Sequence, residues 1–299
     1  MVTGVTGNWA FAAGTVLLAL RRHNPGMEAD IIVFCDDSLL ETDAAILRNL
    51  GAQLVPFTPV PAELTAEALE VFSPLSLAKF DCFDLLQRYT SVVWLDADVL
   101  IQDNIEGLFD CGPLGLALED PEFSDPPGAK PAQINLHEPV EGFDGAADNL
   151  NSGVIVFRND LPAPEALRQG CLEFVCRHGA MLRYPDQAAF NLLAQMLLRQ
   201  YPQSVFQLPQ GFNAHPRNPA AAFAPVVHVG QRFQLAAIPA QQGNAGNALS
   251  AGLVDGGDDV GRIAGGGNAH KNISGAGKCL YLTGENIVEA VVVANGREV

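Results

Sequence analysis

Short apolar runs recur along the first third of the chain, and each is bounded by polar residues or turn signals. Ile31–Cys35, Ala52–Phe57 and Val92–Leu95 are almost wholly apolar. A continuous run of this length predicts a strand that is buried on both faces. Asn151–Phe157 shows the same pattern further along and predicts another strand.

Between these runs the apolar positions recur with the period of a helix. Phe11–Arg22 is one such segment, and the stop signal Asn24-Pro25-Gly26 follows it. Ser38–Leu50 ends at Gly51, which is typical of a helix C-terminus. Strands that alternate with helices at this spacing predict an α/β fold: a mostly parallel sheet with helices on both faces. Two further segments predict helices, Leu75–Arg88 and Asp186–Gln200.

The regular pattern stops in two places, and these define the expected domain organisation. Glu119–Asp148 is rich in proline, glycine and acidic residues, which predicts a functional loop or lid. Gln241–Gly277 is rich in Gly, Ala and Asn, and Leu280–Val293 could form a short strand pair. We therefore expect a single α/β domain over 1–240, a linker or poorly ordered segment over 241–279 and a C-terminal segment of unknown role over 280–299.

Composition narrows the class of protein. The 299 residues carry a formal net charge of −17, which argues against nucleic-acid binding and against a polybasic membrane anchor. No apolar run is long enough to span a membrane, although peripheral membrane association stays open. The six cysteines lack zinc or redox spacing, and reduced core thiols predict a cytoplasmic protein.

The candidate chemistry begins where the strand Val92–Leu95 ends in Asp96 and Asp98. In open α/β sheets ligands bind beyond the carboxyl ends of the strands. Side chains two residues apart on an extended chain point the same way, so the two carboxylates should converge. Adjacent carboxylates repel unless a cation neutralises them, so the pair predicts a divalent metal site. Two solvated turn aspartates are the alternative.

This motif lies in one of five segments that occur in the same order as in a known family. Together they resemble the family 8 retaining glycosyltransferases, the group that contains glycogenin and bacterial lipopolysaccharide galactosyltransferases. The resemblance covers roughly residues 3–233. The segments are Thr6-Gly7-Asn8 with Phe11 and Gly14, Ser76-x-x-Lys79, Val93–Asp98, Asn151-Ser152-Gly153-Val154, and Asp186-Gln187 with Asn191.

The resemblance implies a GT-A-type (Rossmann-like) fold that binds a nucleotide-sugar. It implies a metal-dependent, retaining glycosyltransferase that moves a hexose from a UDP-sugar to a hydroxyl on a glycan, lipopolysaccharide or protein acceptor. His228 would join Asp96 and Asp98 as the third metal ligand. A mixed carboxylate–imidazole set favours Mn²⁺ over Mg²⁺.

The resemblance also assigns roles to individual residues. Phe11 would stack on the nucleobase, Lys79 would contact a phosphate or the donor sugar, and Asp186 with Gln187 would orient the sugar as the catalytic pair. Helix capping is an alternative role for Asp186. The full expected donor-binding set is Thr6, Gly7, Phe11, Lys79, Asp96, Ala97, Asp98, Asn151, Ser152, Gly153 and Arg232.

One segment departs from the family pattern. The family has His-x-x-Gly-x-x-Lys-Pro-Trp, whereas this chain has His228-Val229-Gly230-Gln231-Arg232-Phe233. Arg232 could replace the missing lysine as the cation for the diphosphate. This departure leaves open a domain that binds nucleotide-sugar without transfer. The Asp-x-Asp motif leaves open a haloacid-dehalogenase-like phosphatase, which also places Asp-x-Asp after a strand.

Overall fold

The structure is a computed structural model, and it falls into two units, Met1–His228 and Val229–Val299. It describes residues 1–57, 73–120, 122 and 128–228, apart from the side chain of Asn8. In the second unit it describes the backbone of four strands.

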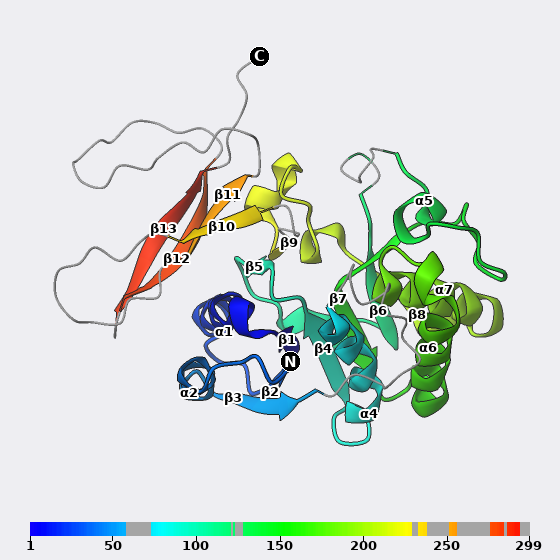
Figure 1. The fold of residues 1–299 in the computed structure, drawn as a ribbon, viewed down its shortest axis with the longest axis horizontal. Coiled ribbons are helices and arrows are strands. Elements are labelled where there is room, and N and C mark those ends of the chain that lie inside the picture. The colour runs from blue at the N-terminus through cyan, green and yellow to red at the C-terminus, as the bar shows by residue number, and fades with distance from the viewer. Residues whose placement is uncertain are drawn as a thin grey trace, which may run out of the picture. The chain divides into compact units, whose positions relative to one another are not determined.

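The first unit is built on a seven-stranded sheet with the order β3-β2-β1-β4-β7-β6-β8 (Figure 1). Strands β1 to β4 pair in parallel, β7 runs antiparallel to both of its neighbours, and β6 pairs in parallel with β8. The predicted mostly parallel α/β sheet is therefore confirmed. The strands are β1 (Val2–Val5), β2 (Ile31–Cys35), β3 (Ala52–Pro56), β4 (Ser91–Leu95), β6 (Leu114–Leu118), β7 (Leu150–Arg158) and β8 (Val205–Leu208).

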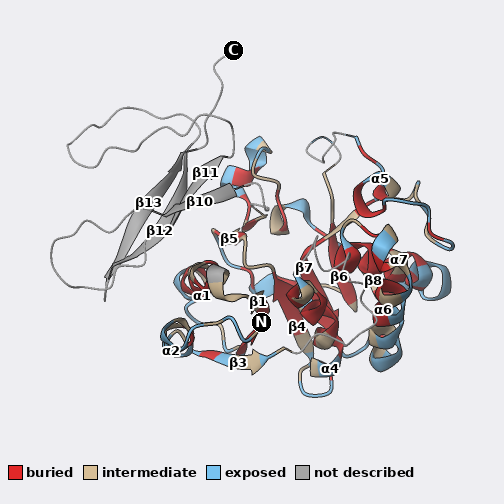
Figure 2. Cartoon of the chain, viewed as in Figure 1, coloured by how far each residue is buried: buried red, intermediate tan, exposed pale blue. Residues whose placement is uncertain are grey.

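Both faces of the central strands are buried (Figure 2). On one face Ile32, Trp94 and Phe157 join a core shared with the helices that follow β3 and β7. On the other face Val33 and Val93 are fully buried, and α1 packs against β1. The helices are α1 (Ala10–His23), α2 (Glu41–Asn49), α4 (Cys82–Leu85), α5 (Pro131–Asn135), α6 (Pro164–His178) and α7 (Pro185–Gln200).

The helix predicted over Leu75–Arg88 is wrong in type. The segment forms a 3₁₀ stretch over Pro74–Asp81 and a single α turn, α4. Four successive residues, from Leu77 to Phe80, are buried, and no residue of the 3₁₀ stretch Pro74–Asp81 is exposed. The amphipathic pattern of a surface helix therefore does not apply to it.

The second unit contains two antiparallel pairs, β10 (Phe233–Ala237) with β11 (Ala251–Asp255) and β12 (Ala276–Thr283) with β13 (Asn286–Val293). The pair β12–β13 lies where the sequence predicted strands. Strand β11, in contrast, lies inside the segment for which the sequence predicted a linker.

The order of the strands in the sheet indicates where a ligand would bind. Strands β1 and β4 are neighbours at the centre of the sheet, and the chain leaves them in opposite directions along the strand order. Ligands of open α/β sheets bind at such a switch point, beyond the carboxyl ends of the strands. Thr6 follows β1 and Asp96 follows β4 at this position.

Candidate active site

Asp96 and Asp98 lie in a tight turn between β4 and β5 (Val99–Ile101). The Asp96 N–H donates to the Gly153 carbonyl of β7 at 2.8 Å, and the Val99 N–H donates back to the Asp96 carbonyl at 3.3 Å. The carboxylates therefore converge because of a turn, and not through the extended geometry that the sequence suggested. Ala97 is the half-buried residue between them.

A strand from the end of the first unit brings the third candidate ligand. Strand β9 (Val226–His228) pairs antiparallel with β5, and this register places His228 opposite Val99. His228 Nε2 lies 3.4 Å from Asp98 Oδ1 and 3.8 Å from Asp96 Oδ2. One ligand atom from each of the three residues falls within 4.8 Å of the others. Two carboxylates and an imidazole at this spacing form a donor set that fits a divalent transition metal.

The charges of the three groups depend on one another. Burial alone would lower the pKa of His228, but Asp98, through its charge and hydrogen bond, and then Asp96 raise it to about 9. Burial alone would raise the pKa of Asp98, and the neighbouring imidazole lowers it below its ordinary value. Without metal, a charged imidazole therefore occupies the position between the carboxylates.

The His228 ring lies so close to the β7 backbone that position 153 must be glycine. A Cβ on Gly153 would lie 2.6 Å from both Cε1 and Nδ1 of the imidazole. Only glycine lets β7 approach the ring this closely. The sequence predicted Gly153 at the donor sugar, and the structure shows what its missing side chain permits.

Lys79 links the aspartate pair to the predicted catalytic residues. Its ammonium group is buried, with 4% of the side chain exposed, and lies 2.9 Å from Asp96 Oδ1 and 2.6 Å from Asp186 Oδ2. Burial opposes the charge, but the two carboxylates raise the pKa of Lys79 above its ordinary value. Lys79 is therefore not one of the solvated surface lysines that are common in proteins.

Asp186 and Gln187 project from the first turn of α7 into the same cluster. Asp186 Oδ2 also accepts a hydrogen bond from Ser152 Oγ at 3.0 Å. Gln187 Oε1 accepts the Ser152 N–H at 3.3 Å, and its Nε2 donates to Asn135 Oδ1 of α5 at 3.0 Å. Helix capping does not explain Asp186, because Tyr184 is the N-cap and Asp186 contacts Lys79 and Ser152.

The predicted nucleobase end lies after β1. Thr6 is the N-cap of the short turn Gly7–Trp9, and its carbonyl accepts the Trp9 N–H at 2.9 Å. The Gly7 N–H donates to Ser38 Oγ at 2.8 Å, and a Cβ on Gly7 would lie 2.2 Å from the Ser38 carbonyl oxygen. Phe11 is half-buried and stacks on Trp9 with ring centroids 6.1 Å apart.

A chain of hydrogen-bonded polar side chains borders the site, and the sequence predicted only Asn151 among them. Asn151 Nδ2 donates to Glu119 Oε2 at 2.6 Å, and Asn151 Oδ1 accepts from Asn213 Nδ2 at 2.7 Å. Glu119 directly follows the apolar strand β6, so the strand-then-carboxylate signal that identified Asp96 could have found it. Nothing in the sequence around Asn213 distinguishes it from an ordinary loop residue.

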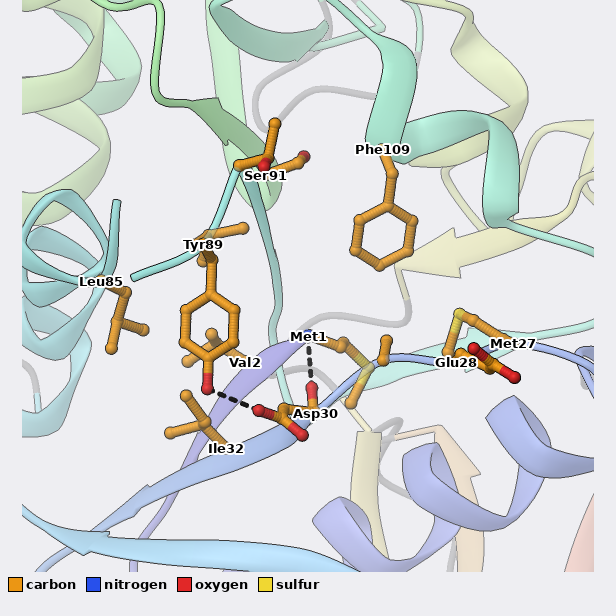
Figure 3. A pocket seen from close by; sticks show the side chains of 13 residues that line it. Met1, Val2, Met27, Glu28, Asp30, Ile32, Leu85, Tyr89, Ser91 and Phe109 are labelled. Carbon is orange, nitrogen blue, oxygen red and sulfur yellow. Dashed lines mark hydrogen bonds between the residues drawn. The ribbon is translucent and has the colours of Figure 1, made fainter. Parts of the chain in front are cut away.

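A separate hollow of about 640 Å³ lies at the opposite end of the sheet (Figure 3). Its walls come from the amino ends of β1, β2 and β4, where the Tyr89 hydroxyl donates to Asp30 Oδ2 at 2.7 Å. None of the predicted site residues lines it. The charged residues predicted for the site gather beyond the carboxyl end of β4 instead.

Arg232 lies outside the described residues, so its contact with a diphosphate stays a prediction. Within the described part of the chain, no helix is long and apolar enough to cross a membrane. The described cysteines are all free thiols: Cys35, Cys82, Cys111, Cys171 and Cys176.

Several solved structures share the fold of this chain. The fold is similar to that of the galactosyltransferase LgtC, solved with donor and acceptor sugar analogs, at 18% identity and a TM-score of 0.54, over 77% of this chain and 87% of LgtC. It is also similar to the bifunctional glycosyltransferase WbbM at 18% identity and a TM-score of 0.53, over 77% of this chain and 45% of WbbM. The glycosyltransferase GlyE of Streptococcus pneumoniae gives 18% identity and a TM-score of 0.50, over 77% of this chain and 54% of GlyE. No curated protein matches the chain.

A family match removes one of the alternatives. The sequence profile described as Glycosyl transferase family 8 matches residues 1–228, which is the whole of the first unit. This match excludes the phosphatase alternative and confirms the GT-A-type fold that the sequence motifs implied. The chain is a glycosyltransferase, and it belongs to glycosyl transferase family 8.

Proposed function

We propose that the protein is a metal-dependent, retaining glycosyltransferase that transfers a hexose from a UDP-sugar to a hydroxyl of a carbohydrate or glycoconjugate acceptor. The convergence of Asp96, Asp98 and His228 beyond the carboxyl end of β4 carries this proposal. These residues would hold the cation, with Mn²⁺ preferred over Mg²⁺ because of the imidazole. A cytoplasmic location, with no nucleic-acid partner, belongs to the same proposal.

The chemistry requires that negative charge on the departing diphosphate be stabilised. A divalent cation supplies Lewis-acid stabilisation to such a leaving group. Thr6, Gly7 and Phe11 would bind the nucleobase end of the donor, and Asn151, Ser152 and Gly153 would lie along the sugar. Ala97 would approach the donor through its backbone, and Arg232 would add positive charge at the diphosphate.

The chain's own residues would orient the sugar for attack from the same face as the departing group. The acceptor hydroxyl would bond to the anomeric carbon as the bond to the diphosphate breaks, and its proton would pass to the departing phosphate oxygen. Asp186 supports this role because Lys79 and Ser152 hold its carboxylate at 2.6 and 3.0 Å. Gln187 is held at both ends of its amide, so its position before substrate binds is already defined.

The proposal predicts that Asp98→Ala lowers Mn²⁺-dependent transfer by more than about a hundredfold, beyond the loss typical of removing a hydrogen-bond partner of a metal ligand. UDP release from a panel of UDP-sugars with Mn²⁺ and with Mg²⁺ measures this effect. Asp103→Ala is the matched control, because Asp103 is an exposed aspartate just beyond β5. Full metal-dependent activity in Asp98→Ala would contradict the assignment of the site.

A second measurement separates transfer from binding. Isothermal titration with UDP and Mn²⁺ gives heat for an enzyme and equally for a domain that binds donor without using it. Only an enzyme consumes donor when a suitable acceptor is present. Binding without consumption across a broad acceptor screen would favour the non-catalytic alternative.

A further inference from the structure

Trp94 makes a contact that its position in the core does not require. It is the fourth residue of β4, and 2% of it is exposed. Its indole Nε1–H donates to Asp96 Oδ1 at 2.6 Å. Lys79 lies against both side chains, so both reach the same side of β4.

The surroundings fix the indole in one position. A Cβ on Gly4 of the neighbouring strand β1 would lie 2.9 Å from Trp94 Cη2, so glycine at this position leaves room for the six-membered ring. The Lys79 ammonium lies 5.8 Å from the ring centroid. A buried ring that is held on several sides directs its N–H along one line.

Because of this N–H, the two carboxylate oxygens of Asp96 have different partners. Oδ1 accepts from Trp94 at 2.6 Å and lies 2.9 Å from Lys79 Nζ. Oδ2 also accepts from Lys79, at a longer 3.2 Å, and faces His228 Nε2 at 3.8 Å. A carboxylate that is anchored through one oxygen presents the other in a defined direction.

We infer that Trp94 is a positioning residue for the metal site: its indole N–H holds the Asp96 carboxylate with Oδ2 turned toward Asp98 and His228. The inference rests on the proposed function, because it requires Asp96 to be a metal ligand. Oδ1, which accepts from Trp94 and contacts Lys79, is then the oxygen held by the protein core, and Oδ2 is the oxygen offered to the cation.

The test removes the N–H and keeps the ring. In Trp94→Phe the aromatic packing remains, and in a protein with benzothienylalanine at position 94 a sulfur replaces the N–H with almost no change of shape. Titration with Mn²⁺ in the presence of UDP, followed by electron paramagnetic resonance, measures both the dissociation constant and the spectrum of the bound ion. We expect Mn²⁺ to bind about tenfold more weakly in both variants, as when a hydrogen-bond partner of a ligand is lost. The spectrum of the bound ion should also change.

The control is Phe157→Leu, which alters a fully buried ring of the same core on β7. We expect it to lower the melting temperature and to leave the Mn²⁺ dissociation constant and spectrum unchanged. Dissociation constants within twofold of wild type, with an unchanged spectrum, in the benzothienylalanine protein would overturn the role of Trp94 alone. A wild-type protein that binds no Mn²⁺ with UDP would overturn the proposed metal site together with this inference.

Discussion

Lys79 holds two carboxylates that the fold has largely removed from water. Its ammonium contacts both Asp96 and Asp186, so one buried positive charge compensates two negative charges. Removing one partner of a buried ion pair leaves an uncompensated charge. The position of Lys79 therefore matters for folding as well as for substrate.

We predict that Lys79→Met lowers the free energy of unfolding by about 3–5 kcal/mol in the absence of ligands. Urea denaturation measures the change. The control is Arg48→Met, which removes an exposed pair with Glu41 and should cost less than about 1 kcal/mol. Equal losses in the two variants would show that the buried cluster contributes no more than a surface pair.

His228 makes the metal-free protein sensitive to pH. Its pKa of about 9 in the fold exceeds its ordinary value of 6.5, so the stabilisation that it provides is complete below pH 6.5 and is lost as pH rises through 9. Because a metal ligand must be deprotonated, Mn²⁺ affinity should rise by up to about tenfold per pH unit over the same range.

Calorimetric titration in buffers of different ionisation enthalpy checks this prediction, since binding near pH 7 should release close to one proton. His228→Gln should bind Mn²⁺ weakly and without this proton release. Affinity that does not change between pH 6.5 and 9 in the wild-type protein would contradict a protonated imidazole at the site.

Strands β5 and β9 join parts of the site that are distant in the sequence. The predicted strands at β2, β3, β4 and β7 are confirmed because their apolar runs are short and complete. The pairing that brings His228 to Asp98 could not be derived from those runs, because β9 has only three residues. The family resemblance, and not the periodicity, pointed to His228.

The contacts among polar side chains were also beyond the sequence pattern. Lys79 lies in a 3₁₀ segment that periodicity assigned to an ordinary helix, and Trp94 lies in a strand where any large apolar residue fits the pattern. A hydrophobicity pattern does not encode the direction of an indole N–H. The sequence therefore predicted which residues gather at the site better than it predicted what they contact.

We predict that Gly153→Ala weakens Mn²⁺ binding, because the new methyl group would lie 2.6 Å from the His228 ring and displace it. The expected loss is on the order of tenfold or more in affinity, comparable to the loss of a ligand's supporting contact. Gly170→Ala on α6 is the matched control, since a Cβ there meets nothing within 4 Å. This substitution should raise the free energy of unfolding by about 0.4–1 kcal/mol and leave Mn²⁺ affinity unchanged. Unchanged Mn²⁺ affinity in Gly153→Ala would mean that β7 can move away from the ring.

Ligand binding should be visible in the stability of the first unit, since the site draws on β4, β7, β9 and α7. We predict that Mn²⁺ with UDP, at a hundred times the dissociation constant, stabilises the fold by about 2.7 kcal/mol. For a domain of this size each kcal/mol raises the melting temperature by about 2–4 °C. Thermal denaturation with Mn²⁺ alone, UDP alone and both together measures the shift.

In Asp98→Ala the joint shift should disappear while the melting temperature without ligands can still be measured. A shift of the same size in this variant would place the ligands elsewhere on the protein. Ca²⁺ in place of Mn²⁺ should give a smaller shift, because an imidazole is a poor ligand for a hard cation.

The place of His228 at the end of the first unit has a consequence for how the protein is made. During translation both aspartates leave the ribosome long before the imidazole does, and a domain generally folds as a unit. A nascent chain that ends short of β9 has only two of the three ligands. The ability to retain a cation would therefore arise late in synthesis, so an incomplete polypeptide would lack the means to draw on the cell's supply of metal and activated sugar.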